Sequence, residues 1–136
     1  MAKATVAAVV TPDTGNPRTV LLTRRNVSPF LGLWCLPGGH VDDFETVADA
    51  VRREVFEETG LNFIPEECLG WFEEIFPEHR FHAVALVFRG PGEGTLKHQP
   101  DEVSEIAWFA LEKALTMNLA FNHNLVLQNY ARSLAP

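Results

Sequence analysis

Residues 46–59 form the segment that most constrains the fold, because its local signals specify a helix with defined ends. The segment reads TVADAVRREVFEET. Thr46 is placed to act as the N-cap, and Asp49, three residues later, gives a weaker version of the capping box. Gly60 stands where a glycine in the left-handed conformation ends a helix. The sequence therefore predicts a helix over 46–59, around which the remaining elements must pack.

Short apolar runs separated by turn-rich segments make up the rest of the chain. They predict strands at 3–10, 19–25, 69–76, 80–88 and 103–109, loops at 11–18, 26–44 and 89–102, and helices at 110–115 and 121–134. We expect the first two strands to pair antiparallel across their loop, and the third and fourth to form a hairpin. The order of elements predicts an α/β domain with one mixed sheet and helices packed against it.

Composition excludes several classes of protein. The chain has 136 residues, close to the size of one domain, and 46% of them are hydrophobic, so disorder is excluded. Its net charge of −7 argues against a broad nucleic-acid-binding surface. No apolar run approaches the roughly 20 residues of a membrane span, and Met1–Thr5 lacks the features of a signal peptide. Cys35 and Cys68 are predicted to be buried apolar thiols. We expect a reduced, cytoplasmic domain.

Three glutamates of the predicted helix share one face. At about 100° per residue, Glu54, Glu57 and Glu58 fall within an arc of about 100° that borders the apolar face. Like charges at this spacing repel each other, and Arg52 and Arg53 are predicted to project elsewhere. A hard divalent cation, Mg²⁺ or Mn²⁺, would compensate these carboxylates. The alternative is an acidic helix face in contact with solvent.

The residues before and along this helix resemble the signature of the Nudix (MutT-like) hydrolases. The matching positions are Gly39-x5-Glu45-x7-Arg53-Glu54-Val55-x-Glu57-Glu58-x-Gly60-Leu61. This Nudix box spans residues 39–61, and the order of strands around it agrees with the family over most of the chain. The resemblance implies one Nudix domain over residues 1–136, folded as an α/β/α sandwich with a mixed β-sheet.

The same resemblance implies Mg²⁺-dependent hydrolysis of a diphosphate joined to another moiety. It assigns Glu57, Glu58 and the Gly39 carbonyl as metal ligands, and Glu54 as a ligand or the general base. Glu45 and Arg53 would form an ion pair that holds the loop against the helix. A cation on the phosphates neutralises their charge and orients a water, and a neighbouring carboxylate takes the proton of that water.

The general base is open, since some family members supply it from a loop outside the box. Glu102 and Glu105 are the alternatives to Glu54, although acids at the start of a strand usually face solvent. Arg24 and Arg25, at the end of the second strand, are candidates for binding phosphate oxygens.

Several further residues are candidates for substrate contact or core packing. Phe30 and Trp34 would either stack on a base or pack in the core, whereas Trp71 and Trp108 are predicted to be core residues. The histidines at positions 40, 79, 82, 98 and 123 lack metal-binding spacing, which favours surface or polar-core roles.

Two short segments bear on the substrate. Leu119–His123 resembles the LAFDH segment of some ADP-ribose-hydrolysing Nudix proteins, with Asn122 in place of the aspartate, and adds Phe121 and Asn122 to the substrate-binding candidates. Pro77 lies where that subgroup tends to carry a proline. These features favour ADP-ribose or another nucleoside diphosphate sugar. The alternatives are a nucleoside triphosphate pyrophosphohydrolase, which the segment 36–40 resembles, and a nucleotide-sensing module without catalysis. We expect a small nucleotide as the partner and leave a homodimer open.

Overall fold

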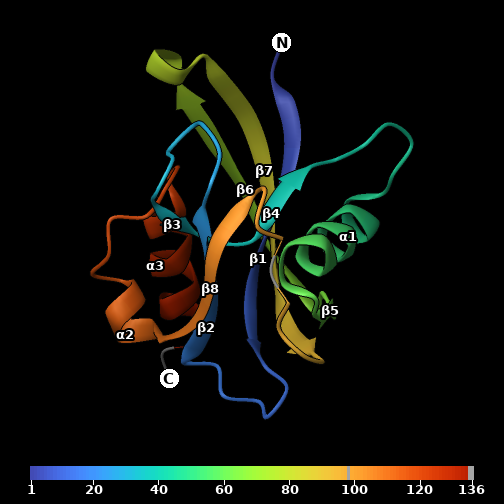
Figure 1. Cartoon of the computed structure of the whole chain (residues 1–136), viewed down its shortest axis with the longest axis vertical. Helices are drawn as coiled ribbons and strands as arrows, with labels where there is room; N and C mark the ends of the chain where they lie inside the picture. The colour runs from blue at the N-terminus through green and yellow to red at the C-terminus, as the bar shows by residue number, and fades with distance from the viewer. Residues whose placement is uncertain (98, 135–136) are drawn as a thin grey trace.

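The computed structural model describes residues 1–97 and 99–134, so His98 lies outside the described part of the chain. Two β-sheets lie in the centre, with α1 (Val47–Thr59) on one side and α2 (Leu111–Ala114) and α3 (His123–Ser133) on the other (Figure 1). This arrangement of layers confirms the predicted α/β class.

The larger sheet has five strands. They are β1 (Lys3–Pro12), β4 (Gly38–His40), β5 (Asn62–Phe63), β6 (Glu67–Phe76) and β7 (Phe81–Glu93). The long β1 and β7 run parallel at the centre, and β4, β5 and β6 add antiparallel partners. The predicted hairpin is confirmed, with a short 3-10 turn, η1 (Pro77–His79), between β6 and β7. Strand β7 also takes the first residues of the predicted loop 89–102.

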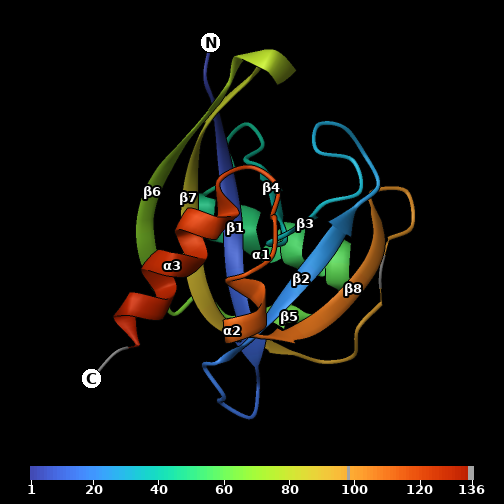
Figure 2. The same ribbon diagram turned by 90° about the vertical axis from the view of Figure 1, so that its left-hand side faces the viewer.

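The smaller sheet has three strands, which corrects the expected single sheet. They are β2 (Thr19–Arg25), β3 (Trp34–Cys35) and β8 (Val103–Ala110), and β2 lies antiparallel between the other two. The predicted pairing of β1 with β2 was wrong. The loop between these strands carries the chain from one sheet into the other, so that β2 and β8 cross β1 and β7 (Figure 2). Both β1 and β2 have consecutive buried residues, and such strands carry no alternation that would reveal their partners.

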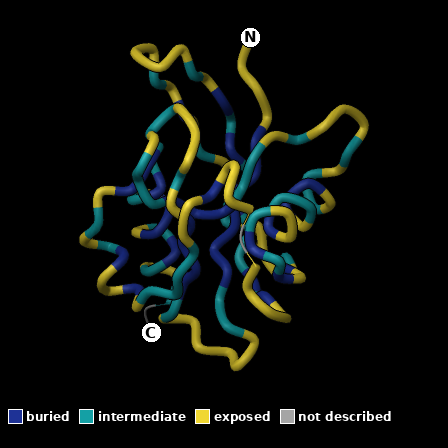
Figure 3. Tube along the Cα trace, viewed as in Figure 1, coloured by how far each residue is buried: buried dark blue, intermediate teal, exposed yellow. Residues whose placement is uncertain are grey.

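Two apolar clusters stabilise this arrangement. Alternate residues of β1 enter each of them, for example Ala7 and Val9 in one and Val6 and Ala8 in the other. The first cluster includes the buried face of α3, and the second includes that of α1. Buried segments lie in the interior between the layers, whereas loops and helix faces are exposed (Figure 3). Since both sheets contribute to both clusters, each helix is anchored against two sheets.

The ends of α1 agree with the sequence signals. The Thr46 hydroxyl accepts a hydrogen bond from the Asp49 backbone N–H at 3.1 Å, and Gly60 adopts the left-handed conformation with φ of 80°. Two core predictions were wrong, since Trp71 is 65% exposed and Cys68 is also exposed. Both belong to β6, an edge strand that pairs with β7 alone among the strands of residues 1–97 and 99–134. None of the helices in the described residues has the length and apolar character needed to cross a membrane.

Candidate active site

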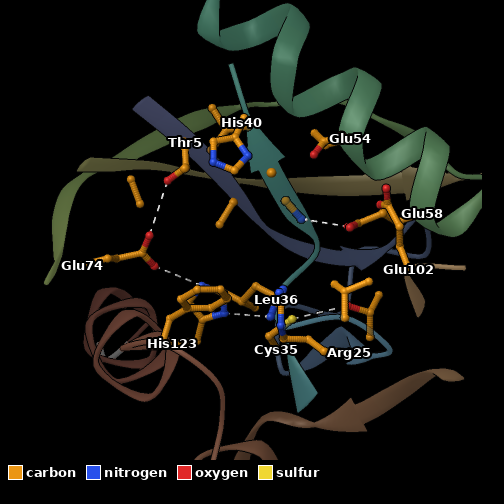
Figure 4. A pocket seen from close by; sticks show the side chains of 18 of the residues that line it. Thr5, Arg25, Cys35, Leu36, His40, Glu54, Glu58, Glu74, Glu102 and His123 are labelled. Carbon is orange, nitrogen blue, oxygen red and sulfur yellow. Dashed lines mark hydrogen bonds and ion pairs between the residues drawn. The ribbon is translucent and has the colours of Figure 1, made fainter. Parts of the chain in front are cut away.

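A cavity of about 270 Å³ lies between the two sheets and beside α1 (Figure 4). We call its part lined by Gly38, Gly39, Glu54, Glu58 and Glu102 the helix end, and its part lined by Thr5, Cys35, Glu74 and His123 the sheet end. In Figure 4, Glu74 and His123 lie on the side of the cavity away from Glu54, Glu58 and Glu102. The two ends therefore offer separate surfaces to an elongated ligand.

At the helix end, β4 lies close against α1. The Gly38 backbone N–H donates to Glu58 Oε1 at 2.9 Å. A Cβ atom at position 39 would overlap the Glu54 carboxylate, and one at position 38 would overlap the Val6 carbonyl oxygen. At position 38 the obstacle is backbone, so only glycine fits there, whereas at position 39 a side chain would require the Glu54 carboxylate to move. The approach brings the backbone of Gly39 and two carboxylates to one place.

Arg53 connects the helix to the preceding loop. Its guanidinium donates to both oxygens of Glu45, at 2.8 and 3.0 Å, and to the His40 carbonyl oxygen at 3.0 Å. The predicted pairing of Glu45 with Arg53 is therefore present. The prediction that Arg53 projects away from the glutamates was wrong, because Arg53 Nη1 also donates to Glu54 at 2.9 Å and to Glu57 at 3.0 Å. The long side chain folds back along the helix, which a helical wheel of Cα positions does not represent.

Burial changes the protonation of the two carboxyls of α1 that line the cavity. Burial, followed by hydrogen bonding with Glu57, raises the pKa of Glu54 to about 8 despite the opposing charge of Arg53. Burial, followed by the charge of Cys35, raises the pKa of Glu58 well above its ordinary value, although the Gly38 N–H acts in the opposite direction. Both groups therefore favour a proton unless a positive charge approaches.

This donor set fits a hard divalent cation. Two partly buried carboxylates, beside a backbone that approaches them closely, offer oxygen ligands only. Within the described residues no group of three acidic, histidine or cysteine side chains is already arranged around one point. Glu57 is 52% exposed at its side chain and turns toward Arg53. A cation held by Glu54 and Glu58 would therefore require Glu57 to rotate, or would use backbone oxygen instead.

The sequence offered two pairs of candidates, Arg24 with Arg25 and Glu102 with Glu105, and the structure distinguishes the members of each pair. Arg25 lines the cavity, and its guanidinium lies 4.9 Å from the centroid of the Phe121 ring. Arg24 instead bonds Glu105 at 2.9 Å on the surface, and neither of these two residues lines the cavity. Glu102 does line it. Of each pair, one member therefore faces the cavity, Arg25 and Glu102.

The aromatic candidates divide in the same way. Phe121 lines the cavity with φ of 55°, a conformation that residues other than glycine rarely adopt. Phe30 packs edge-on against Phe121 outside the lining, and Trp34 packs against Phe109 beside the core. Asn122 donates to the Glu73 carbonyl oxygen at 2.6 Å and does not line the cavity. An aspartate at 122 could not donate this hydrogen bond.

Sequence reasoning missed the sheet end, although it allowed His123 a polar-core role. The Leu36 N–H donates to His123 Nδ1 at 3.0 Å, and Nε2 lies 3.7 Å from Glu74 Oε2. Cys35 lies 3.6 Å from the Thr23 hydroxyl. These residues come from separate strands and one helix, so no spacing along the chain connects them. The sequence showed only a glutamate within a predicted strand and a histidine near the start of a predicted helix. These two features alone are too weak to predict that the residues meet.

Opposing influences act on the two titratable partners of this end. Burial alone would lower the pKa of His123, but Cys35 and Glu74 beside it raise that pKa to about 9. The hydrogen bond from the Leu36 N–H opposes this rise, because a second proton on Nδ1 would remove it. For Cys35, hydrogen bonds with His123 and Thr23 outweigh burial and lower the thiol pKa.

A glycine-rich strand fitted against an acidic helix, at the edge of a cavity between two sheets, defines the class of fold. Residues 1–130 match the family model described as the NUDIX domain, and the chain therefore belongs to the Nudix family. The NUDIX domain of Shewanella oneidensis NrtR, solved as a complex with ADP ribose, superposes with a TM-score of 0.83 at 29% identity, covering 99% of this chain and 90% of that one.

Two curated relatives have their own named activities. The chain is 35% identical over 113 residues to the ADP-ribose pyrophosphatase of Methanocaldococcus jannaschii, covering 83% of this chain. It is 35% identical over 108 residues to the m7GpppN-mRNA hydrolase NUDT17 of Danio rerio, covering 65% of this chain. The chain spans 66% of the length of the archaeal relative and 36% of the length of the zebrafish one.

Proposed function

We propose that this chain is a Mg²⁺-dependent hydrolase that cleaves the diphosphate of a nucleoside diphosphate joined to another moiety. ADP-ribose or a related nucleoside diphosphate sugar is the favoured substrate. The observation that carries this proposal is the helix end itself, where Glu54 and Glu58 face a cavity that continues past Arg25 and Phe121. The relative named as an ADP-ribose pyrophosphatase and the ADP-ribose complex of the similar domain favour this substrate.

Each residue of the helix end has a role in this reaction. Glu54, Glu58 and the Gly39 carbonyl would hold the cation, with Glu57 joining after it leaves Arg53. The bound cation supplies neutralisation of phosphate charge and lowers the pKa of water. Glu54, deprotonated in that state, accepts the proton of the attacking water. Arg53 and Glu45 keep the loop of Gly39 against the helix. Glu102, which also lines the cavity, is the alternative base.

Arg25 and Phe121 would position the rest of the substrate. Arg25 Nε donates to the Pro29 carbonyl oxygen at 2.6 Å, which fixes the guanidinium above Phe121. Among the described residues that line the cavity, Arg25 is the sole arginine or lysine. We assign it to the phosphate oxygens, which it can bind with two parallel hydrogen bonds. The cytoplasmic location, the homodimer and the absence of a nucleic-acid partner stay predictions from the sequence.

Turnover of a matched substrate panel tests this function. The panel contains ADP-ribose, other nucleoside diphosphate sugars, dinucleoside polyphosphates and nucleoside triphosphates, each with Mg²⁺ and with Mn²⁺, and with products identified. We expect ADP-ribose or a related sugar to give the largest kcat/KM and to release a nucleoside monophosphate. A larger kcat/KM for a triphosphate would establish the pyrophosphohydrolase alternative. Binding without any turnover would establish the sensing module, against which the intact set of Glu54, Glu57 and Glu58 argues.

A further inference from the structure

Glu74 has no role in the chemistry of the helix end, yet its carboxylate is buried in the wall of the same cavity. The residue is 3% exposed and projects from β6 toward the sheet end (Figure 4). Burying a carboxylate is costly unless hydrogen-bond donors surround it. A glutamate at this position therefore requires an explanation that packing does not provide.

The protein supplies few donors to this carboxylate. The Thr5 hydroxyl donates to Oε1 at 3.4 Å, and His123 Nε2 lies 3.7 Å from Oε2. Both distances exceed those of good hydrogen bonds. An ionised carboxylate offers about four acceptor positions, so most of its acceptor capacity faces the cavity. The His123 ring is held in this orientation by the Leu36 N–H, which fixes the geometry around Glu74.

Flat, apolar surfaces lie beside this acceptor. Phe81 and Phe121 both line the cavity, with ring centroids 5.2 Å apart, and Ala85 leaves room on β7. Aromatic faces next to one polar acceptor suit a nucleobase, which presents a π face and a donor edge. A ribose would need several polar partners instead. The helix end is occupied by the phosphates in the proposed function, which leaves the sheet end for the base.

We propose that Glu74 is the base-specificity residue of this cavity, accepting a hydrogen bond from an exocyclic amino group of a purine. This inference rests on the proposed function only for the placement of the phosphates. An ionised carboxylate accepts hydrogen bonds and donates none, so Glu74 in that form would bind an amino group and gain nothing from a base that lacks one. It also repels a carbonyl oxygen placed at the same point. The preference for a base with an amino group therefore follows from the negative charge of Glu74 and from its burial.

Equilibrium binding of nucleoside monophosphates tests the proposal without any need for turnover. AMP and purine riboside 5′-monophosphate differ only in the 6-amino group, and GMP and IMP differ only in the 2-amino group. We expect the wild-type protein to bind the amino-bearing member of one pair about tenfold to one hundredfold more tightly. The pair that responds identifies which amino group reaches Glu74.

The variant Glu74→Gln, with Glu73→Gln as its control, assigns this preference to one side chain. Glutamine offers both a donor and an acceptor, so the preference within the responding pair should shrink to about threefold or less. Glu73 is the neighbouring residue on β6 and is exposed, and its replacement makes the same change in charge. Glu73→Gln should keep the wild-type preference. The wild-type comparison alone still tests the proposal if Glu74→Gln does not fold.

Three results would overturn the proposal. They are equal binding within both pairs, a preference that survives in Glu74→Gln, and an affinity that depends on Glu74 only through the sugar. The last case is measured with 2′,3′-dideoxy-AMP: weaker binding than AMP in the wild type, but not in Glu74→Gln, would assign the carboxylate to the ribose diol. Hydrolysis of ADP-ribose without a base preference would refute this inference alone. A Glu74-dependent preference without hydrolysis would refute the proposed function alone.

Discussion

The two ends of the cavity hold carboxylates in different surroundings. At the helix end, Glu54 and Glu58 lie near Glu102, and the single guanidinium of Arg53 is shared by Glu54, Glu45 and Glu57, so negative charge is in excess. At the sheet end, a single carboxylate, Glu74, faces a histidine and a hydroxyl. The helix end therefore needs a bound cation to balance its charge, whereas the sheet end needs hydrogen-bond donors in a defined direction. Four predictions follow from this contrast.

Removal of divalent metal should have the largest effect, because only the helix end depends on an added cation. Turnover should fall to background with excess EDTA in metal-free buffer and return with Mg²⁺ or Mn²⁺. The rate of product release, measured before and after metal addition, checks this. Undiminished turnover in EDTA would mean that the carboxylates of α1 bind no metal needed for the reaction.

Glu54→Gln should lower kcat by at least about 100-fold, since it removes a base or ligand while it preserves shape. The variant should fold, because its side chain keeps an oxygen that can accept from Arg53. Glu102→Gln and Glu105→Gln are the matched comparisons, and Glu105 lies outside the cavity. A near-normal kcat in Glu54→Gln, together with loss of activity in Glu102→Gln, would show that the general base is Glu102, in the loop before β8.

Arg25→Ala should raise KM for the nucleotide by about tenfold, because it removes a charged donor from the cavity. Arg24→Ala provides the control, since its guanidinium is paired with Glu105 on the surface. The control should change KM by less than about twofold. Steady-state kinetics at fixed Mg²⁺ measures both variants. Equal effects from the two would show that general surface charge, and not the cavity, binds the phosphates.

The smallest effect concerns stability without metal. A carboxyl whose folded pKa is raised stabilises the fold fully below its unfolded pKa of 4.5, and this contribution is lost as pH rises through about 8. The Tm of the metal-free wild type should therefore fall by a few °C more than that of Glu54→Gln between about pH 5 and 8.5. Thermal scans of both proteins measure this. Parallel curves would contradict the raised pKa.

Most of the helix end could be predicted from the sequence, because all of its residues except Glu102 lie in one continuous segment. The spacing of Gly39, Glu45 and the glutamates of α1 sets their geometry through a single loop and helix. The direction of the Arg53 side chain could not be predicted, because the spacing of residues along the chain does not determine which side-chain hydrogen bonds form. The sheet end escaped because Thr5, Glu74 and His123 meet only through tertiary pairing. The second sheet escaped for the same reason, since β1 and β2 are buried on both faces.

The parallel pairing of β1 with β7 determines when the cavity forms during folding. Lys3 lies opposite Ala83 and Pro12 opposite Gly92, so each pair joins residues about 80 positions apart. Contacts of such long range close late in folding, after local hairpins and helices. Helix α1 can form early, but Thr5 and Glu74 face one cavity only once β1 and β7 have paired. A bound nucleotide should therefore stabilise only the completed fold, and ligand-dependent protection against unfolding should report the closure of the central sheet.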